Sequence, residues 1–126
     1  MRQAHIGIPI CTQSDIEGFY IDLLGMSLQY QFEVDRDFTH LIFGISRTVP
    51  VYMLGKDDLL LELFCVENVS ANPFHHVAIW VDDRAELIQR VRQKGYRIDI
   101  IPRVENELIF IFDHSGNRFE IKQSAQ

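Results

Sequence analysis

The chain has 126 residues, of which 47% are hydrophobic and 24% are charged. These fractions are ordinary for a globular domain, and they exclude a disordered chain or a mini-protein that depends on disulfides. The formal net charge of -6 disfavours nucleic acid and anionic membranes as partners. No apolar stretch approaches the roughly 18 residues of a membrane span, and the N-terminus does not resemble a secretory signal, so we expect a cytoplasmic protein.

The first half of the sequence predicts a strand, a helix and three further strands. Ser14 and Glu17 match a capping box that opens the helix, and Gly25 is typical of a C-terminal cap. Alternating apolar residues then predict a half-buried strand. After Asp35, helical spacing favours a short helix, although a strand over 39–45 is the alternative. The expected elements are strand 4–10, helix 16–24, strand 28–34, helix 35–44 and the hairpin strands 49–54 and 59–66.

The second half repeats this order of elements after a polar linker at about 67–73. A strand begins at His76, a capped helix covers 83–94, and three strands cover 97–103, 107–113 and 118–123. His76-Val77-Ala78-Ile79 echoes His5-Ile6-Gly7-Ile8, and Phe119-Glu120-Ile121 echoes Leu61-Glu62-Leu63. We therefore predict an α+β fold of two tandem β-α-β-β-β modules, at about 1–67 and 74–126, within one domain that spans 1–126.

Four ionisable residues occupy equivalent places in the two modules. Successive side chains of a strand point to opposite faces, so each of these residues lies opposite the aliphatic face that the helices can cover. A single such residue is most simply a surface or hydrogen-bonded side chain. Their joint placement favours a metal site instead. The predicted ligands of one divalent cation are His5, Glu62, His76 and Glu120.

Two imidazoles and two carboxylates suit a borderline divalent ion, namely Zn, Ni, Co, Mn or Fe. Such an ion stabilises negative charge on a carbonyl oxygen, and a neighbouring carboxylate can remove a proton from the adjacent carbon. Glu120 and Glu62 are the candidate catalytic bases. Trp80 and Phe64 share faces with these residues and would suit an aromatic substrate.

At these residues the sequence resembles the vicinal-oxygen-chelate superfamily, which includes glyoxalase I, extradiol dioxygenases, fosfomycin-modifying enzymes and bleomycin-binding proteins. The likeness extends over nearly the whole chain. It rests on the two repeated motifs above, on Phe19-Tyr20 and Leu24-Gly25-Met26, and on Val81-Asp82-Asp83 and Asp113-His114-Ser115-Gly116-Asn117. It implies a curved, incomplete barrel of paired modules around a metal cleft, and frequent homodimers.

The resemblance also orders the candidate functions. Glu62 occupies a position where the glyoxalase I type has a ligand and the ring-cleaving dioxygenases usually lack one. The expected function is therefore a metal-dependent lyase or isomerase of the glyoxalase type that acts on a small carbonyl compound or thiol adduct. An Fe²⁺ ring-cleaving dioxygenase and a non-catalytic binding protein for a drug or metabolite are the alternatives. No set of glutathione-binding residues is recognisable, so the substrate stays open.

Overall fold

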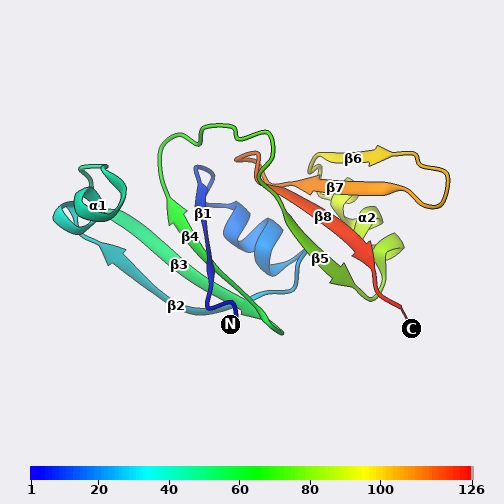
Figure 1. The fold of residues 1–126 in the computed structure, drawn as a ribbon, viewed down its shortest axis with the longest axis horizontal. Coiled ribbons are helices and arrows are strands. Elements are labelled where there is room, and N and C mark those ends of the chain that lie inside the picture. Colours follow the sequence, from blue (N-terminus) through cyan, green and yellow to red (C-terminus); the bar gives the residue numbers. More distant parts are fainter. Residues whose placement is uncertain (126) are drawn as a thin grey trace. The chain divides into compact units, whose positions relative to one another are not determined.

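The structure is a computed structural model that describes residues 1–125. It divides into two compact units, Met1–Val69 and Ser70–Gln126, each with its own four-stranded sheet (Figure 1). Among the described residues, no helix is both long and apolar enough to cross a membrane. The two units are described in turn.

The first unit contains the strands β1 (Ile6–Ile10), β2 (Ser27–Val34), β3 (Val49–Lys56) and β4 (Leu59–Cys65). Their order across the sheet is β1-β4-β3-β2. The first and last strands of the unit, β1 and β4, run parallel, whereas the other pairs are antiparallel. The parallel pair places the N-terminal strand beside the strand that carries Glu62.

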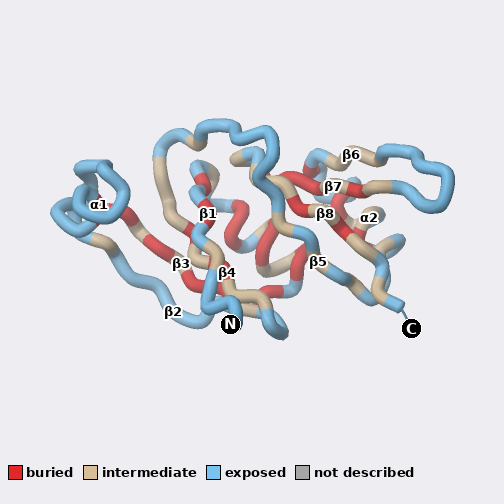
Figure 2. Tube along the Cα trace, in the orientation of Figure 1, coloured by how far each residue is buried: buried red, intermediate tan, exposed pale blue. Residues whose placement is uncertain are grey.

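The helix η1 (Ile16–Ile21) follows β1 in the first unit. Its predicted apolar stripe is buried, as Figure 2 shows for this segment, and comprises Ile16, Phe19, Tyr20, Leu23 and Leu24. The predicted capping box is wrong. The helix is wound as a π-helix with Asp15 as its cap residue, and no side-chain capping bond forms. Gly25 does adopt the left-handed conformation expected after a helix, with φ of 71°.

The short helix predicted after Asp35 is confirmed as α1 (Arg36–Phe43). The Asp35 carboxylate accepts a hydrogen bond from the backbone N–H of Phe38 at 3.0 Å, and Gly44 ends the helix with φ of 73°. The prediction for β2 is wrong in one respect. This strand is exposed rather than half-buried, because it forms the edge of the sheet and no element of its unit covers Tyr30 and Phe32.

The second unit repeats the arrangement of the first. Its elements are β5 (Val77–Val81), α2 (Arg84–Gln93), β6 (Ile98–Ile101), β7 (Leu108–Phe112) and β8 (Arg118–Gln123). The strand order is β5-β8-β7-β6, with β5 and β8 parallel. The predicted α+β fold with two β-α-β-β-β modules is confirmed.

Candidate metal centre

The first histidine and glutamate of the predicted ligand set meet in the first module. Glu62 lies in the middle of β4, and its register partner on β1 is Gly7. His5 directly precedes β1, two residues before Gly7, so it extends from the same face of the sheet. The His5 Nε2 and Glu62 Oε1 atoms are 3.2 Å apart, and 43% of the His5 side chain is exposed against 15% of Glu62.

The distance between these two donors fits a shared cation. Ligand nitrogens and oxygens lie about 2.0–2.2 Å from an ion such as Zn²⁺, so two adjacent ligands of one ion stand about 3.0–3.5 Å apart. The imidazole and the carboxylate already have that separation. Without a cation, an N–H group of the imidazole can donate a hydrogen bond to the carboxylate across this distance. The pair is therefore a fitting half of a metal site.

The second module places its histidine and glutamate in the equivalent positions. Glu120 lies in β8 opposite Ala78 of β5, and His76 stands two residues before Ala78. The Nδ1 atom of His76 is 3.1 Å from the Phe74 carbonyl oxygen. A carbonyl can only accept, so Nδ1 carries a proton in this contact, and the tautomer with its proton on Nδ1 keeps the lone pair of Nε2 for a ligand.

Glu120 has a neighbour that Glu62 lacks. The Lys122 ammonium lies 3.2 Å from the Glu120 Oε2 atom, and it also stacks over the Trp80 ring at 5.5 Å from the centroid. Strand periodicity places Lys122 and Glu120 on one face, but the ion pair was not predicted. A cation at Glu120 would share the carboxylate with this ammonium or displace it.

The turn before β8 holds the strand in place. Asp113 is 4% exposed, and its carboxylate accepts hydrogen bonds from the backbone N–H groups of Ser115 and Asn117 at 2.9 Å each. The Asn117 side-chain amide donates a third bond at 2.8 Å, and Gly116 supplies a φ of 89°. The motif at 113–117 is thus a structural turn that sets the start of the strand carrying Glu120.

Neither module contains a complete ligand set. Within residues 1–125, no group of three or more His, Cys, Asp or Glu side chains is close enough to hold a metal ion. Burial raises the pKa of the Cys65 thiol at the end of β4, so this residue stays protonated at neutral pH and offers no thiolate. What each module does present is one histidine and one carboxylate on a shared face.

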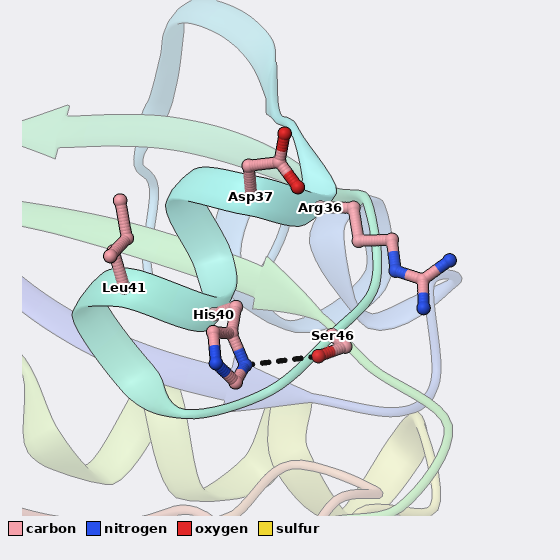
Figure 3. Close-up of a pocket in the computed structure, with 5 residues that line it drawn as sticks. All are labelled: Arg36, Asp37, His40, Leu41 and Ser46. Carbon is pink, nitrogen blue, oxygen red and sulfur yellow. Dashed lines mark hydrogen bonds between the residues drawn. The ribbon is translucent and has the colours of Figure 1, made fainter.

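A separate hollow of about 520 Å³ lies against α1. Figure 3 shows its lining side chains, with the His40 Nδ1 atom and the Ser46 hydroxyl joined by a 3.0 Å hydrogen bond. The other lining residues are Arg36, Asp37 and Leu41. All five are exposed. None of the predicted ligands lines this hollow, so it is distinct from the candidate metal residues.

Two repeated β-α-β-β-β modules, each with a His–Glu pair at the same register, define a paired-module fold with a candidate metal-binding face. Residues 2–121 match the family model of the Glyoxalase/Bleomycin resistance protein/Dioxygenase superfamily. The chain therefore belongs to this superfamily. No curated protein matches the sequence.

Solved structures share the fold at low sequence identity. The fosfomycin resistance protein FosX from Listeria monocytogenes is 14% identical with a TM-score of 0.75, covering 99% of this chain and 94% of that one. The trypanothione-dependent glyoxalase I of Leishmania major is 22% identical with a TM-score of 0.75, covering 98% and 86%. A variant of the Listeria protein, complexed with Mn(II) and 1S,2S-dihydroxypropylphosphonic acid, is 14% identical with a TM-score of 0.71, covering 94% and 86%.

Proposed function

We propose that this protein is a metal-dependent lyase or isomerase of the glyoxalase type, which acts on a small carbonyl compound or a thiol adduct of one. The observation that carries the proposal is the 3.2 Å approach of His5 Nε2 to Glu62 Oε1, a separation suited to two ligands of one ion. The repeat of this pair in the second module and membership of the superfamily support it. The Listeria protein, which shares this fold, is complexed with Mn(II), and this supports the proposal.

In this proposal His5, Glu62, His76 and Glu120 hold one divalent cation, which is Zn, Ni, Co, Mn or Fe. When bound, the ion would supply Lewis-acid stabilisation of the negative charge that develops on a carbonyl oxygen. Glu62 or Glu120 removes the proton from the adjacent carbon and returns it to the product. The His76 ring is held for its role by the bond from Nδ1 to the Phe74 carbonyl. The protein is proposed to act in the cytoplasm as a homodimer.

Metal binding is tested first, by elemental analysis and by calorimetric titration of Zn²⁺ and Ni²⁺ into protein stripped with a chelator. We expect one ion per set of four ligands, and we expect His5→Ala and Glu62→Gln each to weaken binding about 100-fold, since each removes a direct ligand. The matched control is His75→Ala, because His75 neighbours His76 but bonds to Asn72. Unchanged affinity in both ligand variants contradicts the proposed site.

The reaction is tested with the hemithioacetal of methylglyoxal under anaerobic conditions. Exchange of the hydrogen on the carbon next to the carbonyl into deuterated solvent reports proton transfer directly. We expect exchange in the metal-loaded protein and its loss in Glu62→Gln and Glu120→Gln. Metal binding without exchange, across several 2-oxoaldehydes and thiols, would leave the cation site in place and overturn the lyase or isomerase assignment.

A ring-cleaving Fe²⁺ oxygenase is the second candidate. The observation that favours it is the aromatic character of the two ligand faces, where Phe64 and Trp80 share the sides of Glu62 and Glu120. The carboxylate at Glu62 counts against it. Oxygen uptake with catechols by the iron-loaded protein, and not by the zinc-loaded protein, would favour the oxygenase function.

A further inference from the structure

We propose that Phe64 and Phe43 form a subsite for a flat apolar group of the ligand, such as an aryl ring, directly beside the His5–Glu62 pair. This inference rests on the proposed function, because it assumes that the pair marks the ligand face. It names the chemical class of substrate that the first module selects, namely a carbonyl compound or thiol adduct that carries an aryl substituent.

The strand register determines which residues lie side by side on this face of the sheet. Residues directly opposite one another across strands share a face of the sheet. One row consists of Gly7, Glu62, Met53 and Tyr30, and the next consists of Pro9, Phe64, Val51 and Phe32. The second row contains no charged residue. The candidate ligand Glu62 is therefore flanked along its own strand by an apolar row.

Gly7 leaves room for the Phe64 ring close to the His5–Glu62 pair. A Cβ atom built on Gly7 would lie 3.1 Å from the Phe64 Cε2 atom, which is tighter than ordinary van der Waals contact. The ring therefore leans over β1 at the residue that is the register partner of Glu62 and lies two positions from His5. A side chain at this position would require the ring to move by a few tenths of an ångström.

Phe43 extends the surface from a helix that the second module lacks. Its ring meets the Phe64 ring edge-on, with centroids 5.4 Å apart and an interplanar angle of 73°. Thr39, one turn earlier on α1, is buried, which fixes this side of the helix against the module. Phe43 nevertheless remains 52% exposed. Two aromatic rings thus adjoin one another on the face that carries Glu62, with surface left for a third.

The occupant that fits is an aryl ring rather than a charged or aliphatic group. A ring can stack in an offset manner on one phenyl group while it meets the edge of the other, which is the arrangement that aromatic clusters prefer. A charged group would face the uncharged side chains of Pro9, Phe64 and Phe32 and would lose its hydration without a partner.

The test compares two chelators that share a metal-binding group and differ in one substituent. Acetohydroxamate and benzohydroxamate are titrated calorimetrically into the zinc-loaded protein. We expect benzohydroxamate to bind about tenfold more tightly, and we expect Phe43→Ala and Phe64→Leu to remove most of that preference while leaving acetohydroxamate within about twofold. The matched control is Phe38→Ala, a phenylalanine of similar exposure on the same helix.

A second measurement separates this subsite from the metal proposal. In the chelator-treated, metal-free protein, benzyl alcohol at millimolar concentration should shift the NMR ring signals of Phe43 and Phe64, and ethanol should not. If neither hydroxamate binds but these shifts appear, the metal proposal fails and the aryl subsite stands. A phenyl preference that survives Phe43→Ala and Phe64→Leu, or an absence of shifts at both rings, overturns the subsite. If Phe43 is buried in a dimer contact, the ring signals will not shift, and this result also overturns the subsite.

Discussion

Glu120 and Lys122 stand on the same face of β8, and their side chains form an ion pair at 3.2 Å. The equivalent carboxylate in the first module contacts an imidazole instead, so the two glutamates are not equal as metal ligands. The Lys122 side chain is 42% exposed, and screening by water limits the effect of its ammonium on the carboxylate. Lys122 is therefore a modest competitor for any cation that binds Glu120.

Replacing this competitor should strengthen metal binding. We predict that Lys122→Met raises the affinity for Zn²⁺ about threefold, the effect of removing a partly exposed ion pair worth about 0.6 kcal/mol. Methionine keeps the length of the side chain beside Trp80. Competition with a fluorescent zinc chelator measures the change, and Lys56→Met, on an exposed position at the end of β3, serves as the control. Weaker binding in Lys122→Met would mean that the ammonium orients the carboxylate rather than competing for it.

At the level of single residues, the sequence predicted the strand face of each candidate ligand but not the distances between the ligand atoms. Alternation along a strand is a property of the backbone, so the parity of His5 and Glu62 could be read directly. Their 3.2 Å approach depends on the parallel pairing of β1 with β4, which joins residues far apart in the chain. The same holds for Phe64 over Gly7, which no local pattern reveals.

Among the elements, the turn at 113–117 contributes to stability through hydrogen bonds that its motif alone does not show. The buried Asp113 carboxylate satisfies two backbone donors and one side-chain amide between β7 and β8. These bonds close the loop that leads into the strand of Glu120. A substitution here should act on stability before it acts on any ligand.

We predict that Asp113→Ala lowers the free energy of unfolding by about 3 kcal/mol, because hydrogen bonds to a buried charged group are lost and their donors are left unpaired. Asp113→Asn should recover part of this loss, since its amide oxygen still accepts a bond. Urea unfolding followed by circular dichroism measures both variants against Asp58→Ala, an exposed control in the hairpin turn between β3 and β4. Equal stability of all three variants would show that the turn closes without this carboxylate.

The helices illustrate why some elements are easier to predict than others. Asp35 and Gly44 bound α1 as expected, because capping depends on residues within one turn of the helix end. The period of apolar residues likewise located η1, but not its π-helical winding or its cap. Its apolar stripe is buried, and tertiary packing of this kind can override the local propensity that sequence reasoning uses.

For the whole molecule, the exposed stripe of α1 bears on assembly. Phe38, Leu41 and Ile42 are 60%, 79% and 61% exposed, although their helical spacing is that of a buried face. They lie on another side of the helix from Phe43, which contacts Phe64. Contiguous apolar side chains of this size are typical of surfaces that bind another protein.

We predict that the protein is a homodimer and that Leu41→Glu weakens it, because a charge would be buried against an apolar partner surface. Light scattering after size exclusion should give about twice the 14.7 kDa mass of one chain. Ser46→Glu, at another exposed position near α1, controls for added charge. A monomeric wild-type protein at micromolar concentration contradicts the prediction, and a dimer unaffected by Leu41→Glu would place the interface elsewhere.

The sequence by itself determined the two-module α+β fold, the order of the elements and the faces on which His5, Glu62, His76 and Glu120 lie. The period of apolar residues depends on neighbours along the chain, and the repeat is visible in the sequence itself. Only the tertiary structure decided the exposure of β2, the ion pair at Glu120 and the aromatic surface of Phe64 and Phe43. Burial depends on which elements cover a strand. Contact between side chains depends on strand register, and both are settled by parts of the chain that are distant in sequence.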